Sequence, residues 1–219
     1  MKKTVLLGLI VGLTLLGCSK RDQSLASDEP PYYPLKMASL SYMPYSGATT
    51  LVFVNETGEE IRLNAPKGVE TDTVWNYNYD GTSKIYYNEF RRIRFTGYHP
   101  DGHDIQLLFD ISVVQSKKDP SAVFDLLSIT FWDDYTHAPT GYLMDYKLIS
   151  STRENQVTLE DIWLSQEPEF ISNLNLLGYE FSEVYKEESP DNLEMYCAKG
   201  QGIVAFKDLR GYWVLHKKE

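Results

Sequence analysis

The chain has 219 residues, of which 31 are acidic and 21 are basic, so its formal charge at neutral pH is −10. Such an acidic surface argues against a nucleic-acid partner and against electrostatic adhesion to anionic lipid headgroups. Apolar residues make up 42% of the chain and aromatic residues 13%, which is enough for a hydrophobic core and excludes a globally disordered chain.

The first residues have the layout of an export signal. Two lysines at residues 2–3 precede an apolar run over residues 5–16, which is too short to remain as a membrane-spanning helix. The run ends in Leu-Leu-Gly-Cys at residues 15–18, a sequence that resembles the lipobox of bacterial lipoproteins at all four positions.

This resemblance implies that residues 1–17 are removed as a signal peptide and that Cys18 carries lipid. Each buried methylene of an acyl chain contributes about 0.8 kcal/mol, and two or more chains give stable anchoring. A lipidated Cys18 would therefore hold the protein at a membrane without a transmembrane helix. We expect an envelope lipoprotein whose domain lies outside the cytoplasm, at the outer membrane rather than the inner one.

The chain after the signal divides into a tether and one domain. Residues 18–31 comprise the lipidated cysteine and a polar stretch that ends in two prolines, which is typical of a flexible tether. No linker-like segment interrupts residues 32–219, so we expect one β-rich domain there. Cys197 is the only other thiol and alternates with apolar neighbours, which predicts a buried core position and no intramolecular disulfide.

Alternating apolar and polar residues predict strands through most of this domain. The clearest strand is 105–113, in which every second residue is apolar. Only residues 158–166 indicate a helix, which Pro168 limits to about two turns. The expected strands cover residues 51–54, 61–63, 74–79, 84–87, 91–98, 105–113, 123–132, 142–149, 193–197, 203–206 and 212–216.

These elements predict a mainly β fold: one antiparallel domain of about ten strands, as a half-barrel or sandwich, with at most one or two short helices. Residues 196–206 resemble the closing hairpin of small envelope lipoproteins of unassigned function, which implies a β-rich envelope domain. We expect a concave face, with an apolar pocket, lined by Leu107, Phe109, Ile111 and Phe131.

Residues 99–104 contain the only local cluster of side chains that bind metals, namely His99, Asp101, His103 and Asp104. The zinc spacing and the calcium-loop pattern are both missing, and the Pro-Asp-Gly sequence explains the segment as a hairpin turn. We therefore predict a turn, with no metal site and no cofactor.

Asp133, Asp134 and His137 form the other candidate for chemistry. Glycoside hydrolysis needs two carboxyls about 5–9.5 Å apart across a sugar, whereas adjacent residues of a strand point to opposite faces. The sequence also has no nucleophile elbow, phosphate loop or dinucleotide fingerprint. We predict no catalytic residue.

Two functions remain open at this point. The favoured one is a non-catalytic binding or interaction module, anchored through Cys18, that holds an apolar ligand, a glycan or an envelope protein. The alternative is an envelope-polymer hydrolase that uses carboxylates such as Asp101, Asp104, Asp133 and Asp134. The first is favoured because each candidate residue has a structural explanation and no nucleophile–base set is found.

Overall fold

The structure, a computed structural model, describes residues 32–77, 85–115, 123–133, 142–150, 169–188 and 193–219. Residues Pro31–Glu219 form one compact unit. The predicted signal peptide, Cys18 and the tether lie outside the described residues, as do the predicted 158–166 helix, Asp134 and His137.

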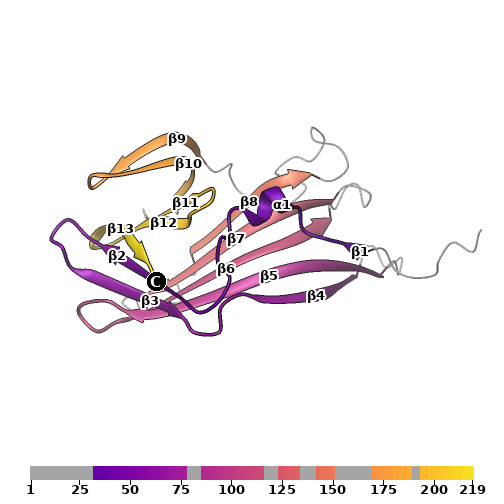
Figure 1. The fold of residues 1–219 in the computed structure, drawn as a ribbon, viewed down its shortest axis with the longest axis horizontal. Helices are drawn as coiled ribbons and strands as arrows, with labels where there is room; N and C mark the ends of the chain where they lie inside the picture. The colour runs from indigo at the N-terminus through magenta and orange to yellow at the C-terminus, as the bar shows by residue number, and fades with distance from the viewer. Residues whose placement is uncertain (1–31, 78–84, 116–122, 134–141, 151–168, 189–192) are drawn as a thin grey trace, which may run out of the picture. The chain divides into compact units, whose positions relative to one another are not determined.

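The fold is mainly β, as predicted, and the described residues include one short helix, α1 (Met37–Leu40) (Figure 1). The strands are β1 (Tyr32–Tyr33), β2 (Thr49–Val54), β3 (Glu60–Ala65), β4 (Glu70–Tyr77), β5 (Ile85–Tyr98), β6 (Asp104–Gln115), β7 (Val123–Asp133), β8 (Tyr142–Ser150), β9 (Glu169–Leu176), β10 (Tyr179–Glu188), β11 (Glu194–Ala198), β12 (Gly202–Asp208) and β13 (Gly211–Lys218).

The thirteen strands of the described ranges belong to one open sheet in the order β8-β7-β6-β5-β3-β2-β13-β12-β11-β10-β9, with β4 and β1 also paired to β5. Neighbouring strands are antiparallel, which confirms the predicted class, and β1 alone among the described strands pairs in parallel. The count exceeds the expected ten partly because β9 and β10 had not been predicted. Most β9 side chains are exposed, so its sequence lacks the alternation that marks a half-buried strand.

Strand β5 is continuous, whereas the sequence had suggested a break between residues 87 and 91. The break was wrong because β5 changes partners there: β4 and β1 flank its first half, and β6 pairs with it from Phe90 onward. Where the partners of β5 change, the Asn88 side chain links β5 to β6, because its Nδ2 donates a hydrogen bond of 2.5 Å to the Val113 carbonyl.

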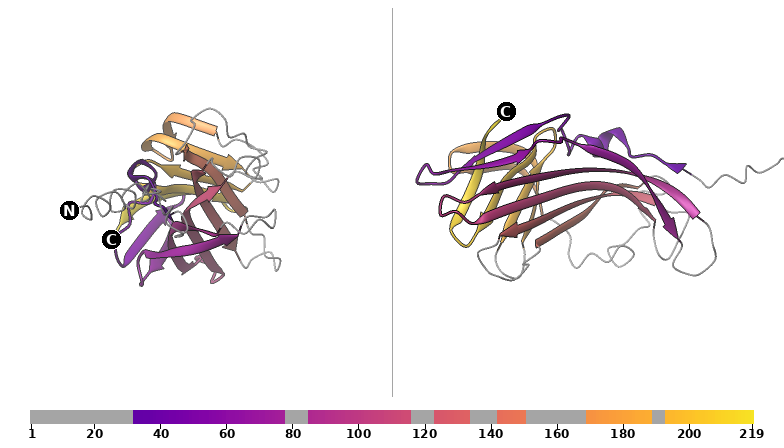
Figure 2. Two further views of the ribbon diagram at one scale, coloured as in Figure 1. Left: turned by 90° about the vertical axis from the view of Figure 1, so that its right-hand side faces the viewer. Right: turned by 90° about the horizontal axis from the view of Figure 1, so that it is seen from below.

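The sheet curves so that its two halves share one hydrophobic interior (Figure 2). The rings of Phe131 on β7 and Phe206 on β12 lie 5.2 Å apart although these strands are far apart in the sheet order. Leu107, Phe109 and Ile111 are fully buried in the same core, and Phe131 is nearly so. The four residues share one face as predicted, and burial of each such side chain contributes roughly 1.5–3 kcal/mol.

The prediction of an open apolar pocket on this face was wrong, because side chains of the N-terminal segment (residues 35–45) pack on the face. The Tyr45 ring packs edge-on against Phe95 and Phe109, at 5.3 and 5.8 Å. The Tyr45 hydroxyl accepts a hydrogen bond of 2.9 Å from the backbone N–H of Ile203. A side chain at Gly202 would collide with that hydroxyl, so glycine is required there.

Two carboxylates hold the start of the same segment on the sheet. The backbone N–H of Leu35 donates to Glu89 at 3.1 Å, and that of Lys36 donates to Asp125 at 2.9 Å. Burial raises the pKa of the Asp125 carboxyl, although hydrogen bonds from Ser39 and Lys36 oppose the shift. Helix α1, which carries Ser39, thus lies over the inner face of the sheet.

The β9–β10 hairpin packs on the opposite, outer face of the last strands. Phe181 and Val184 of β10 join Tyr196 and Val214 in a second buried apolar cluster. Glu183, between Phe181 and Val184, has a left-handed backbone with φ of 50°. This irregularity lets Phe181 and Val184, which are three residues apart in the strand, face the same cluster. The hairpin therefore covers β11–β13.

Candidate functional site

Three hairpin turns meet at one end of the sheet, which we call the turn end (Figure 1). They are the β2–β3 turn (residues 55–59), the β5–β6 turn (residues 99–103) and the β12–β13 turn (residues 209–210). The tip of the folded β9–β10 hairpin (residues 177–178) lies beside them, since Leu177 lines a hollow together with all three turns.

A buried carboxylate joins two of these turns. Asp208 Oδ2 lies 3.0 Å from His99 Nε2 and accepts a hydrogen bond of 3.0 Å from Trp213 Nε1. Its Oδ1 accepts a hydrogen bond of 2.8 Å from the backbone N–H of Arg210. Because the carboxylate binds groups from both sides, the β5–β6 and β12–β13 turns are fixed relative to each other.

This His–Asp pair is structural rather than catalytic. The side chains of His99 and Asp208 are 0% and 2% exposed, so no substrate reaches either of them. A catalytic His–Asp pair requires a histidine that contacts both a nucleophile and the substrate's leaving group. His99 lines one of two hollows at the turn end, and Trp213, which donates to Asp208, lines the other.

The first hollow, the turn cleft, has a volume of about 540 Å³. Asp101 and Arg210 form an ion pair across it, with 2.7 Å between Oδ2 and an Nη atom. The cleft is lined by Glu56, Thr57, Asp101, Leu177, Arg210 and Tyr212, among others.

The second hollow, the outer groove, lies on the outer face of β3, β5 and β6 and has a volume of about 730 Å³. Core residues alternate with its lining residues along each strand, which turns the lining side chains outward. The residues that define the groove are Arg62, Asn64, Thr96, Tyr98, Asp104 and Gln106.

A close backbone crossing forms the floor of the outer groove. A Cβ atom on Gly97 would lie 2.1 Å from the Arg62 carbonyl oxygen, so only glycine allows β5 to pass β3 there. The two strands pair only at Asn64 and Thr96 among the described residues. Beyond that point they diverge, and the divergence opens the groove.

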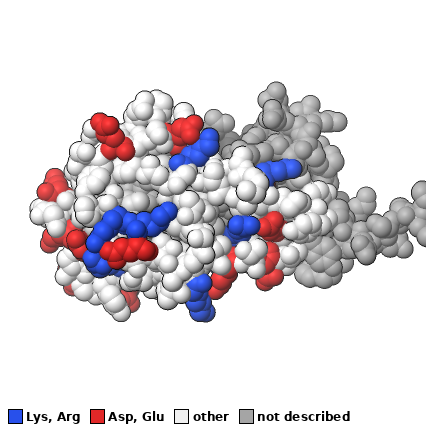
Figure 3. Space-filling model, in the orientation of Figure 1, with Lys and Arg blue, Asp and Glu red and all other residues white. Residues whose placement is uncertain are grey.

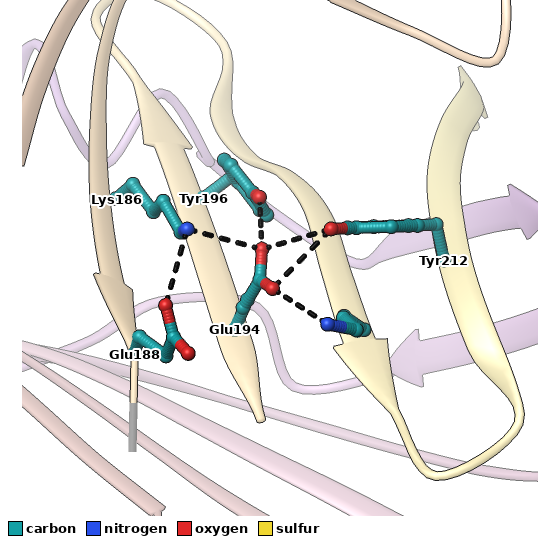
Figure 4. Close-up of polar contacts among 6 residues, drawn as sticks. Lys186, Glu188, Glu194, Tyr196 and Tyr212 are labelled. Carbon is teal, nitrogen blue, oxygen red and sulfur yellow. Dashed lines mark hydrogen bonds and ion pairs between the residues drawn. The ribbon is translucent and has the colours of Figure 1, made fainter. Parts of the chain in front are cut away.

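A third polar feature, the Glu194 cluster, lies on the outer face of β10–β13 (Figure 4). The Glu194 carboxylate accepts hydrogen bonds from Lys207 at 2.8 Å, from the Tyr212 hydroxyl at 3.2 Å and from the Tyr196 hydroxyl. Lys186 lies 3.4 Å from the same carboxylate and 3.3 Å from Glu188.

The electrostatics of this cluster keep the Glu194 carboxyl ionised and the Tyr196 phenol neutral at neutral pH. Burial by itself raises the pKa of the Glu194 carboxyl, but hydrogen bonds from Lys207 and Tyr196 and the charge of Lys186 bring it below its ordinary value. Burial and the neighbouring Glu194 raise the pKa of the Tyr196 phenol. An ionised carboxylate that already accepts three hydrogen bonds and a neutral Tyr196 phenol are poorly suited to act as a general base or a nucleophile.

The side chains of the candidate metal-binding residues in the 99–104 segment do not point to a common site. Residues 99–103 form a hairpin turn, as predicted, in which the Gly102 N–H donates to the His99 carbonyl at 2.8 Å and Gly102 has φ of 92°. His99 is buried against Asp208, whereas Asp101 pairs with Arg210. No group of three or more His, Cys, Asp or Glu side chains able to hold a metal ion occurs within the described part of the chain.

The remaining candidate residues from the sequence do not form a site together within the described residues. Cys197 is fully buried, which confirms its core position. Asp133 ends β7, and Asp134 and His137 fall outside the described residues. Asp104 pairs in register with Tyr98 and lines the outer groove, whereas Asp101 lines the turn cleft, so the two carboxylates do not share a site.

The comparisons with known proteins return nothing: no family model, no curated protein and no solved structure matches this chain. Across the described ranges, no helix has the length and hydrophobicity that a bilayer crossing requires. On the face shown in Figure 3, acidic and basic side chains are interspersed.

Proposed function

We propose that this chain is a lipid-anchored bacterial envelope protein that acts as a non-catalytic binding module through its turn end. The lipobox-like residues 15–18 support the anchor at Cys18. The observation that carries the binding role is the pair of open hollows, of about 540 and 730 Å³, at the turn end. Volumes of roughly 300–1,000 Å³ are usual for ligand sites.

The anchor is tested by metabolic labelling with palmitate in a bacterial host that processes lipoproteins. We expect the full chain to take up label and Cys18→Ala to lose it. The matched control is Cys197→Ala, which removes the other thiol and should keep the label. Equal labelling of the Cys18 variant and the full chain would contradict the proposed anchor.

The non-catalytic role is tested on the full chain purified in detergent and incubated with envelope polysaccharides and peptidoglycan. We expect a polymer or a protein partner to bind without release of soluble fragments. A Glu56→Ala/Arg210→Ala double variant changes the turn cleft, and Tyr98→Ala changes the outer groove. Release of reducing ends or peptides in proportion to enzyme concentration would instead identify a hydrolase.

A further inference from the structure

Two aromatic side chains lie at the outer groove: Tyr98 lines it, and Trp132 pairs with its lining residue Gln106. Tyr98 is 67% exposed, which is unusual for so large a ring at the end of a core strand. Trp132 on β7 pairs in register with Gln106 and is half-buried, and its neighbour Phe131 points into the core. The indole therefore lies on the same outer face as the groove, beside Gln106.

Hydrogen-bonding side chains lie in one row that ends at Trp132, and Tyr98 lies two residues along β5 from this row. Backbone pairing aligns Asn64 with Thr96, Thr96 with Gln106, and Gln106 with Trp132, across four strands. Asn64 Oδ1 accepts from the Thr50 hydroxyl at 2.9 Å, which leaves its amide hydrogens as donors. A primary amide and a hydroxyl each offer both donors and acceptors, as a ligand rich in hydroxyls requires.

The charges in the groove disfavour an anionic ligand. Arg62 is the basic residue of the groove, and its guanidinium is already paired with Glu60 and Glu219, each at 3.4 Å. Asp104 adds a further negative charge to the rim. A phosphate or carboxylate ligand would therefore meet no unpaired cation among the lining residues.

From this geometry we infer that the outer groove binds a short neutral oligosaccharide. The C–H faces of the sugar rings pack on Tyr98 and Trp132, and the hydroxyls at their edges exchange hydrogen bonds with Thr96 and Gln106. A hollow of about 730 Å³ accommodates a ligand of this size. The inference rests on the proposed binding function and specifies its site and ligand class.

The test uses the full chain in detergent on an array of immobilised neutral oligosaccharides: glucans, mannans, xylans and galactans, with uronic-acid oligosaccharides for comparison. We expect a neutral member to bind more tightly than its acidic counterpart. For that member, Tyr98→Ala should weaken binding about tenfold, while Tyr98→Phe, which keeps the ring, should change it by less than about threefold. Gln106→Ala should also weaken binding.

The control is Leu177→Ala, which alters the turn cleft and should leave saccharide binding unchanged; a urea unfolding curve verifies that each variant is folded. Three results would each overturn the inference: no saccharide binding, binding of acidic members only, or Tyr98→Ala and Gln106→Ala variants that bind as tightly as the native chain. A protein partner that Leu177→Ala releases would, in that case, leave the proposed binding function intact. Cleavage of the bound saccharide would overturn the proposed function itself.

Discussion

The outer face of this sheet carries two polar clusters that differ in one respect. In the Glu194 cluster, one buried carboxylate accepts hydrogen bonds from two tyrosines and a lysine, and a second lysine lies 3.4 Å away. In the outer groove, Thr96 and Gln106 stand beside an exposed Tyr98, and no side-chain hydrogen bond joins them to one another. The first cluster is complete without a ligand, whereas the second offers its hydrogen-bonding groups to one.

This difference suggests that the Glu194 cluster serves the stability of the fold and that the outer groove serves binding. Buried polar groups are costly unless each has a partner, so a saturated network is what a stable fold needs. Polar groups left open in a hollow contribute little to folding and are available for recognition. The comparison therefore predicts large stability effects in the Glu194 cluster and small ones in the groove.

The largest effect should come from Glu194→Ala, which removes the acceptor of the buried Tyr196 hydroxyl and the partly buried Tyr212 hydroxyl and leaves Lys186 and Lys207 without their shared carboxylate. We expect the free energy of unfolding, measured with urea at neutral pH, to fall by about 3 kcal/mol. Glu188→Ala is the matched control, because Glu188 also pairs with Lys186 but its side chain is 47% exposed. That control should cost about 0.5 kcal/mol or less, and equal losses in the two variants would contradict the comparison.

The same cluster should make stability depend on pH in a defined direction. The pKa of Glu194 in the folded chain lies below its ordinary value of 4.5. Its ionisation therefore stabilises the fold above pH 4.5, and this contribution is lost as the pH falls through the lowered pKa. The difference in urea midpoint between the native chain and Glu194→Gln should shrink as the pH is lowered from about 7 to about 3. A difference that stays constant over this range would show that the Glu194 charge does not contribute.

A smaller effect is expected from Tyr212→Phe, which removes one hydrogen bond to Glu194 and keeps the ring beneath the Lys207 ammonium. The loss should be about 1 kcal/mol in the same urea assay. Tyr179→Phe provides the control, since the Tyr179 hydroxyl bonds His216 at an exposed position. If the two phenylalanine variants are equally stable, the Glu194 cluster does not depend on its phenols.

The smallest effect should come from the outer groove. Tyr98→Ala and Thr96→Ala should each change the free energy of unfolding by less than about 0.5 kcal/mol, because their side chains face solvent and lack internal partners. The measurement is the same urea curve, so the values compare directly with those for Glu194. A loss above about 1 kcal/mol for either variant would show that the groove is part of the structural framework.

Much of the inner face could be predicted from the sequence. The alternation in residues 105–113 identified the face of β6 that is buried, and the Pro-Asp-Gly sequence identified the turn that follows β5. Cys197 was assigned to the core because it alternates with apolar residues along β11. Each of these inferences depends on neighbours within a few residues, and local periodicity is what a single sequence contains.

The outer face could not be predicted in this way. Polar residues do stand at alternate positions in residues 60–64 and 104–106, as the outward-facing side chains of a strand do. Their convergence on one groove depends on the register of β3 with β5, on the glycine at position 97 and on the strand order. The Glu194 cluster was missed for the same reason, since its five members come from four strands.

The sequence alone therefore determined the class of the fold and the buried face of its clearest strand, and it supplied the resemblance on which the proposed lipid at Cys18 rests. Only the tertiary structure decided that Tyr45 fills the concave face, that His99 is buried against Asp208 and that Asn64, Thr96 and Gln106 share a row. The physical reason is that burial patterns repeat with the geometry of one strand, whereas sites are formed by strands whose pairing depends on the packing of the entire sheet.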